Sequence, residues 1–259
     1  MNYYLIIATI LFLYMTVWFI ISLWKKRNDV ADIAWGLGFV IISWLSFFIA
    51  SEYSWRAILV NIIVMIWGLR LAVHIYRRNS KKQEDYRYLD WRNKWGKWFL
   101  IRSYLQVYLL QGFFLLIIIS SVIFINKNSA SIINIFDIIG CLVWLMGFLF
   151  EVVGDWQLAK FIKDPNNRGR IMQTGLWKYT RHPNYFGEVV QWWGIFIIAL
   201  SLPMGIITII SPITITILIL FVSGIPLLEK KMINNPEFKE YARKTSIFIP
   251  WPSKYKYYK

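Results

Sequence analysis

Apolar runs of about twenty residues recur along this chain and alternate with short polar segments. The runs lie at residues 3–23, 30–50, 57–76, 103–125, 132–153, 186–201 and 206–226, and Pro203 and Pro212 fall near the edges of the last two. A helix rises about 1.5 Å per residue, so about twenty residues cross a hydrocarbon layer of about 30 Å. The pattern therefore predicts an all-α, polytopic membrane protein with about seven transmembrane helices.

The polar segments between the runs are too short to form a soluble domain of their own, since the longest has only about thirty residues. We therefore expect a single integral-membrane domain over residues 1–259. The first apolar run is predicted to be a retained helix and not a cleaved signal peptide. No basic residue precedes it, and Lys25, Lys26 and Arg27 follow it, which reverses the charge order of a signal peptide.

The net charge of +15 is unevenly distributed. Most basic residues lie in four blocks, at 25–27, 77–102, 160–181 and 230–259, and the alternate loops hold few. This alternation is typical of the positive-inside rule and predicts an N-terminus outside and a C-terminus in the cytoplasm. Most of the positive charge is explained by its role in orienting the chain in the membrane and in contacting anionic lipids. The remaining basic residues are available to an anionic ligand. We expect no nucleic-acid partner.

The chain has one cysteine, Cys141, within an apolar run, which excludes a disulfide inside the chain. Two histidines, His74 and His182, are too few for a histidine-rich metal site. We therefore expect no metal centre.

Polar residues in the first half of the chain interrupt apolar runs, where charged groups are costly and often functional. Asp32 lies near the start of the second run, and Trp67 and Arg70 share one helical face of the third. Arg70 either extends to the membrane interface or meets a carboxylate inside the bundle, and Asp32 is its expected partner. Gly36 and Gly38 are expected to allow close packing of helices.

Two carboxylates, Glu151 and Asp155, lie one turn apart at the end of the fifth run. A helix C-terminus favours cations, so these carboxylates need compensation from basic side chains or from ligand hydroxyls and amides. The loop that follows is basic and rich in turn-forming residues, and it includes Lys163 and Arg170. Basic groups in such a loop suit phosphate binding.

The segment at residues 175–191, Gly-Leu-Trp-Lys-Tyr-Thr-Arg-His-Pro-Asn-Tyr-Phe-Gly-Glu-Val-Val-Gln, brings the most polar groups to one helix entrance. Pro183 suits the first turn of the sixth helix. The polar residues there are Arg181, His182, Asn184, Glu188 and Gln191. The last three share one helical face, which indicates either a ligand site or a satisfied polar network between helices.

These segments resemble the steroid 5-alpha-reductase family, in particular its bacterial, largely uncharacterised branch, which is distantly related to isoprenylcysteine carboxyl methyltransferases. The resemblance extends over essentially the whole chain and is most specific at residues 141–251. It rests on Asp32-Ile-Ala-Trp35, Trp67-Gly-Leu-Arg70, Glu151-Val-Val-Gly-Asp155, the segment Gly175–Glu188, and the stretch from Pro226-Leu-Leu-Glu229 to Tyr241.

The resemblance implies a membrane oxidoreductase that passes hydride from NADPH to a carbon–carbon double bond of a hydrophobic, steroid-like or isoprenoid-like enone. It implies catalytic positions at Asp32, Trp67 and Arg70, where an acid and a tyrosine of the family polarise the substrate carbonyl; Trp67 is the nearest match to that tyrosine. The cofactor-binding positions are Glu151, Asp155, Lys163, Arg170, Tyr179, Arg181, His182, Asn184, Glu188 and Gln191. Glu151 and Glu229 depart from the residues of the animal enzymes.

Two other functions compete with this prediction. An S-adenosylmethionine-dependent methyltransferase acting on a lipid or an isoprenylcysteine-type substrate would use a similar polar pocket. The second competing function is that of a non-catalytic membrane protein, such as a transporter or a scaffold. A transporter, however, is expected to carry polar residues near mid-bilayer. In each case we expect a multi-pass integral membrane protein. The resemblance to the bacterial branch implies that the membrane is a bacterial inner membrane.

Overall fold

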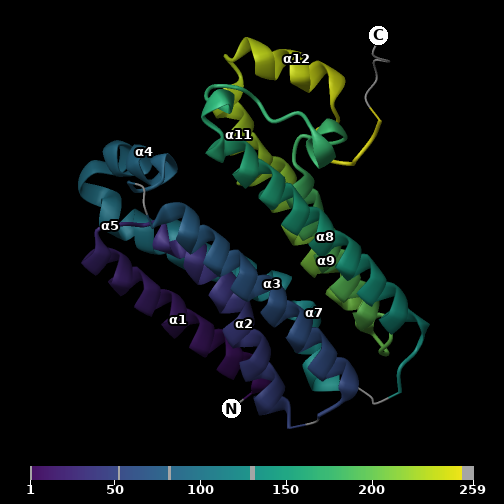
Figure 1. Ribbon diagram of the computed structural model, residues 1–259. Coiled ribbons are helices and arrows are strands. Elements are labelled where there is room, and N and C mark those ends of the chain that lie inside the picture. The colour runs from purple at the N-terminus through teal and green to yellow at the C-terminus, as the bar shows by residue number, and fades with distance from the viewer. Residues whose placement is uncertain (1, 52, 81–82, 129–131, 253–259) are drawn as a thin grey trace. The chain divides into compact units, whose positions relative to one another are not determined.

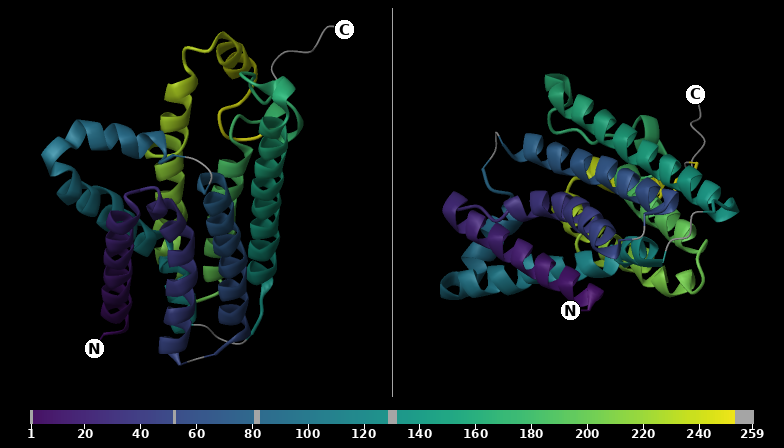
Figure 2. Two further views of the ribbon diagram at one scale, coloured as in Figure 1. Left: turned by 60° about the vertical axis from the view of Figure 1, so that its left-hand side comes forward. Right: turned by 90° about the horizontal axis from the view of Figure 1, so that it is seen from below.

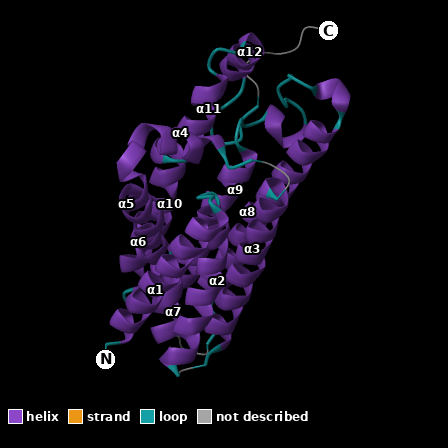
Figure 3. Cartoon of the chain, turned by 90° about the vertical axis from the view of Figure 1, so that its left-hand side faces the viewer, coloured by secondary structure: helices purple, strands orange, loops and turns teal. Residues whose placement is uncertain are grey.

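The computed structural model describes residues 2–51, 53–80, 83–128 and 132–252. Within these ranges the chain is helical apart from turns, loops and one isolated bridge between Thr180 and Ser246 (Figure 3). The chain forms two compact units (Figure 1). The first unit comprises residues 1–134 and 202–211, and the second comprises residues 135–201 and 212–259.

The first unit is a bundle of apolar helices, in which α1, α2 and α3 run alongside one another (Figure 2). Its helices are α1 (Tyr3–Lys25), α2 (Val30–Ala50), α3 (Trp55–Asn79), α4 (Tyr86–Trp95), α5 (Phe99–Arg102), the π-helical segment Ser103–Leu109, α6 (Leu110–Ile118) and α7 (Ser120–Asn128). Helices α2 and α3 pack through Gly36 and Gly68, where a Cβ on either glycine would lie within 2.8 Å of the other's carbonyl oxygen. The expectation that Gly36 permits close packing is confirmed.

A buried polar network joins α2, α3 and α7 inside the first unit. Asn61 Nδ2 donates to Asn126 Oδ1 at 2.7 Å, and Asn126 Nδ2 donates to Ser46 Oγ at 2.7 Å. Ser43 hydrogen-bonds to Asn61, and all four side chains are fully buried. Polar groups within an apolar bundle are tolerated when they are paired in this way, so this network has a structural role.

The second unit is built on a pair of helices, α8 (Ile135–Lys163) and α9 (Pro183–Ala199). The rest of this unit contains most of α10 (Ile210–Ile217), the π-helical segment Leu218–Val222, α11 (Ile225–Met232) and α12 (Pro236–Lys244), with short 3₁₀ turns at Pro165–Asn167 and Gly175–Lys178. In the first unit, a further 3₁₀ turn at Gly205–Ile209 packs on α7.

Six helical stretches in the described part of the chain are long and apolar enough to span a membrane. They confirm the prediction of an all-α, polytopic membrane protein. The predicted span at 186–201 falls on α9, whose 17 residues extend for about 26 Å, slightly short of a hydrocarbon layer of about 30 Å. The predicted span at 103–125 is divided at Ile119, and the candidate spanning stretch there is the helical segment from Tyr86 to Ile118.

Candidate functional site

The entrance to α9 is held in place by the C-terminal part of the chain. The backbone amide of Arg181 donates to the carbonyl of Ser246 at 2.9 Å, and the hydroxyl of Thr180 donates to the carbonyl of Phe248 at 2.8 Å. The amide of Trp251 donates to the carbonyl of Tyr179 at 3.0 Å. Residues 179–182 are therefore fixed on one side by an extended strap that follows α12.

A second set of contacts fixes the 3₁₀ turn that precedes this entrance. Gly175 has a φ of +63°, and a Cβ there would lie 2.4 Å from the amide of Gln157. The indole nitrogen of Trp177 donates to the carbonyl of Gly154 at 3.1 Å. The hydroxyl of Tyr241 donates to the carbonyl of Trp177 at 2.5 Å, and burial raises the pKa of that phenol above its ordinary value. Glycine at 175 is thus favoured by the backbone conformation, and a larger residue would also displace the amide of Gln157.

Glu229 of α11 binds the two basic residues that open the entrance. Its Oε1 lies 2.9 Å from His182 Nε2 and 3.2 Å from Arg181 Nε. The side chain of His182 is almost fully buried, and its ring stacks on that of Tyr185. Glu229 therefore neutralises the positive charge of Arg181 and orients the histidine ring.

Two carboxylate–amide pairs link α8 to α9. Gln191 Nε2 donates to Glu151 Oε2 at 2.5 Å, and Asn184 Nδ2 donates to Asp155 Oδ1 at 3.0 Å. Glu151 is 3% exposed and Gln191 is 1% exposed. The structure thus brings together four of the predicted cofactor-binding residues. The two carboxylates thus accept hydrogen bonds from side-chain amides of the protein, which were not among the compensating partners expected from the sequence.

A glycine seam sets the distance between these two helices. Glycines recur at seven-residue intervals on both helices: Gly140, Gly147 and Gly154 on α8, and Gly187 and Gly194 on α9. A Cβ on Gly147 would lie 2.6 Å from the carbonyl oxygen of Gly187, and one on Gly187 would lie 2.4 Å from that of Gly147. Without side chains there, the backbones approach closely enough for the short Asn and Gln amides to reach the carboxylates.

The basic loop after α8 is open to solvent. Lys163 and Arg170 are exposed and form no ion pair with any described residue. Asp164 caps the turn by accepting a hydrogen bond from the amide of Asn166 at 2.9 Å, and Gly169 has a φ of +82°. The two cations are therefore available to an anion. Near this loop in sequence, Tyr179 is exposed, and Glu188 on α9 is half-buried.

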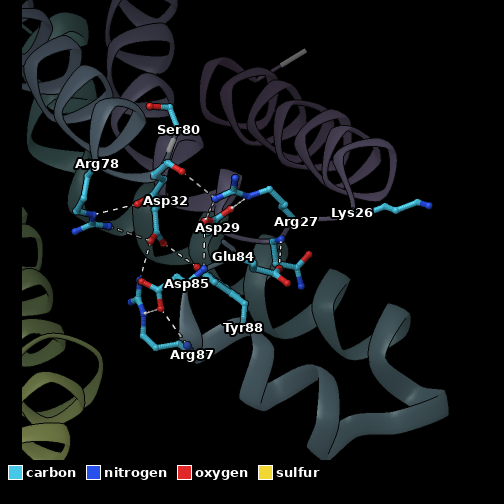
Figure 4. Close-up of polar contacts among 12 residues, drawn as sticks. Lys26, Arg27, Asp29, Asp32, Arg78, Ser80, Glu84, Asp85, Arg87 and Tyr88 are labelled. Atoms are coloured by element: carbon cyan, nitrogen blue, oxygen red, sulfur yellow. Dashed lines mark hydrogen bonds and ion pairs between the residues drawn. The ribbon is translucent and has the colours of Figure 1, made fainter. Parts of the chain in front are cut away.

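In the first unit, Asp32 lies at the centre of a separate polar cluster (Figure 4). Its Oδ2 accepts a hydrogen bond from Arg87 Nη2 at 2.7 Å, and its Oδ1 accepts one from the hydroxyl of Tyr88 at 2.7 Å. Arg78 lies 3.9 Å away. The expected pairing of Asp32 with Arg70 is therefore wrong. Helix α4, which the sequence did not indicate as part of a site, supplies both principal partners.

Further ion pairs lie within the turn between α1 and α2, and within α4 and the segment before it. Arg27 forms a two-pronged contact with Asp29, at 2.7 and 3.0 Å, and Arg92 lies 3.1 Å from Glu84. Asp85 accepts from Arg87 at 3.0 Å. Burial acts to raise the pKa of Asp85, but the hydrogen bond and positive charge of Arg87 outweigh it, so this pKa is lowered.

The other two predicted catalytic residues lie on α3. Trp67 is 2% exposed and packs edge-to-face on Phe39, with ring centroids 5.2 Å apart. Arg70 is half-buried one turn further along the helix. Among the described residues, no group of three or more histidine, cysteine, aspartate or glutamate side chains is arranged to hold a metal ion.

Comparison with known proteins gives one family and two similar sequences. The family described as "Protein of unknown function (DUF1295)" matches residues 18–245. An uncharacterized protein of Schizosaccharomyces pombe is 23% identical over 197 residues, which cover 66% of this chain and 57% of that protein. The 3-oxo-5-alpha-steroid 4-dehydrogenase 1 of Bos taurus is 38% identical over 55 residues, 21% of each chain. The chain thus spans less than two thirds of either relative. No solved structure matches.

Proposed function

The chain belongs to the family described as "Protein of unknown function (DUF1295)", and we propose that it is a membrane-embedded reductase of the steroid 5-alpha-reductase type. In this proposal it reduces the carbon–carbon double bond of a hydrophobic enone with hydride from NADPH. The observation that carries the proposal is the pairing of Glu151 with Gln191 and of Asp155 with Asn184 beside an open basic loop. The local similarity to the bovine 3-oxo-5-alpha-steroid 4-dehydrogenase 1 supports it.

The side chains of the second unit fit a phosphate-bearing cofactor. Lys163 and Arg170 carry positive charge that no described carboxylate neutralises, so they suit the cofactor phosphates. Arg181 is already bound to Glu229, which gives it a positioning role as well as a charge. NADPH, when bound, supplies the hydride and the protein supplies its orientation.

The remaining polar groups of the second unit would recognise the uncharged parts of the same cofactor. Carboxylates accept hydrogen bonds from hydroxyls and amides, and Asp155, Glu188 and Glu151 lie on α8 and α9. Tyr179 is exposed at the entrance and offers an aromatic surface beside its hydroxyl. Asn184 holds Asp155 in place and Gln191 holds Glu151, through the hydrogen bonds described above, and His182 contacts Glu229.

The reduction of an enone places negative charge on the carbonyl oxygen, which a preorganised donor stabilises. Asp32 accepts hydrogen bonds from Arg87 and Tyr88, so in this proposal it is a positioning residue. Trp67 and Arg70 are then the donors that we propose for the carbonyl, because they share one face of α3.

We further propose that the basic blocks face the cytoplasm, with the N-terminus outside, in a bacterial inner membrane, and that a lipid-like substrate enters from the bilayer. A cysteine placed at Ser80, just after α3, tests this orientation. We expect an impermeant thiol reagent to leave it unlabelled in intact cells and to label it after lysis; labelling in intact cells contradicts the orientation.

Cofactor binding by the purified protein tests the proposed function. We expect NADPH to raise the Tm and S-adenosylmethionine to have no effect. Glu188→Gln should weaken NADPH binding by roughly 10-fold, since a hydrogen bond to a charged group contributes about 1.5–3 kcal/mol. The exposed Glu240→Gln on α12 is the matched control and should bind normally. Stabilisation by S-adenosylmethionine alone would identify a methyltransferase, and no stabilisation by either would favour a non-catalytic protein.

A further inference from the structure

Several arginines of the first unit are neutralised by a carboxylate. Arg27 is paired with Asp29, and Arg87 with Asp32. Arg92 is likewise paired with Glu84. The arginines that point into the cluster around Asp32 are therefore already compensated and cannot attract a further anion strongly (Figure 4).

Four lysines near the ends of α1 and α4 form a second set, which we name the α1–α4 basic face: Lys25, Lys26, Lys94 and Lys97. All four are exposed, and none forms an ion pair with a residue in the described part of the chain. Figure 4 shows Lys26 directed away from the cluster, opposite to the neighbouring Arg27. Their positive charge is thus open to an external partner.

One hydrogen bond connects the two parts of this face. The guanidinium of Arg92 on α4 donates to the backbone carbonyl of Lys26 at 3.5 Å, so α4 lies beside the end of α1. Lys26 ends α1 in a left-handed conformation, with a φ of 55°, and the chain turns there toward Asp29. The lysines at the end of α1 and those at the end of α4 therefore belong to one region of the unit.

Exposed tryptophans accompany these lysines. Lys25 Nζ lies 4.6 Å from the ring of Trp24, which is 77% exposed, and Lys97 Nζ lies 5.8 Å from the ring of Trp98, which is 53% exposed. Apolar side chains such as Leu100 and Ile101 continue the exposed surface. Tryptophan and lysine at the end of apolar helices are typical of the boundary between lipid tails and headgroups.

We propose that the α1–α4 basic face binds the headgroups of anionic phospholipids and thereby holds α4 against the end of α1. The occupant must carry negative charge next to apolar chains, because unneutralised lysines adjoin exposed Trp98, Leu100 and Ile101. A lipid satisfies both requirements at once, whereas a soluble phosphate compound would leave the apolar side chains uncovered. This inference does not depend on the proposed reductase activity.

Hydrogen exchange of α4 in lipid nanodiscs tests this inference with the full-length protein. We expect the amides of residues 86–98 to exchange roughly 10-fold more slowly in discs of phosphatidylcholine with phosphatidylglycerol than in phosphatidylcholine alone, because each lysine contributes to anionic-lipid binding. Lys94→Gln with Lys97→Gln should abolish the difference. High salt should reduce it in the unmodified protein, because salt screens exposed charges.

Lys239→Gln with Arg243→Gln is the matched control, since it removes the same charge from exposed positions on α12 in the second unit. This control variant should leave the lipid effect on the exchange of α4 intact. In both double variants, the hydrogen exchange of α2 and α3 should be unchanged, and this result would show that the bundle is folded. Equal exchange of α4 in both kinds of disc overturns the inference. So does loss of the effect in the control variant, or equal protection by inorganic phosphate in phosphatidylcholine discs.

Discussion

Gln191 on α9 donates a hydrogen bond to the carboxylate of Glu151 on α8, and both side chains are almost completely buried. A buried carboxylate is costly unless hydrogen bonds satisfy it. The pair therefore needs the close approach of the two helices that Gly147 and Gly187 permit. The hydrogen bond between Gln191 and Glu151 therefore depends on the glycine pattern of α8 and α9.

Replacement of Gln191 by leucine should destabilise the protein, because it removes a donor to the buried Glu151 carboxylate at similar volume. A hydrogen bond to a charged group contributes about 1.5–3 kcal/mol, so we expect a clearly lower Tm in detergent. Glu151→Gln combined with Gln191→Leu should recover part of the loss, since no buried carboxylate remains. A Tm that is equally low in the double variant would argue against a role for the carboxylate.

Gly147→Ala should force α8 and α9 apart, because its Cβ would lie 2.6 Å from the carbonyl oxygen of Gly187. Overpacking of this kind costs about 1–3 kcal/mol, which thermal unfolding would measure. Leu142→Ala, at an exposed position on the same helix, is the control and should change stability less. Unchanged stability of the Gly147→Ala variant would show that the seam tolerates wider spacing than the structure has.

The ion pair between Asp32 and Arg87 predicts energetic coupling between these residues. In a double-mutant cycle of Asp32→Asn and Arg87→Gln, we expect the coupling energy to be about 0.5–3 kcal/mol. The corresponding cycle with Arg70→Gln should give nearly additive effects, since the carboxylate of Asp32 is bound by α4. A larger coupling of Asp32 to Arg70 than to Arg87 would restore the pairing that the sequence suggested.

The docking of α4 should weaken at acidic pH because of Asp85. Its pKa in the folded state is lowered from the ordinary value of about 3.8. A carboxyl group with a lowered pKa stabilises the folded state fully above its unfolded-state pKa, and this contribution is lost as the pH falls through the folded-state value. We expect hydrogen exchange of residues 86–95 to accelerate, relative to its intrinsic pH dependence, below about pH 3.8. Asp85→Asn should remove that step and weaken docking at neutral pH; an unchanged step would assign it to another group.

The apolar pattern predicted the helices well, because the length of a span follows directly from the thickness of a membrane. It placed α1 and α2 within two residues of their observed ends. It failed at Ile119, where the helix divides between α6 and α7 although the apolar run continues. Hydrophobicity alone cannot locate a helix break when the residues on both sides of the break are apolar.

The sequence also singled out the polar residues that the structure pairs between α8 and α9, namely Glu151, Asp155, Asn184 and Gln191. Which residue pairs with which depends on the register of the two helices, and the seven-residue glycine repeat reflects that register. The partner of Asp32 could not be predicted, because Arg87 and Tyr88 lie in a segment whose many basic and aromatic residues indicate only a membrane interface.

Transfer of hydride to a substrate shows most directly whether this chain is an NADPH-dependent reductase. The purified protein would be incubated with an enone steroid and NADPH deuterated at the transferable position, and the recovered lipid would be analysed by mass spectrometry. We expect a reduced product that carries one deuterium, and little product from the Glu188→Gln variant at limiting cofactor. A protein that is folded and binds NADPH, yet returns a panel of steroid and isoprenoid enones unlabelled, would contradict the proposed function.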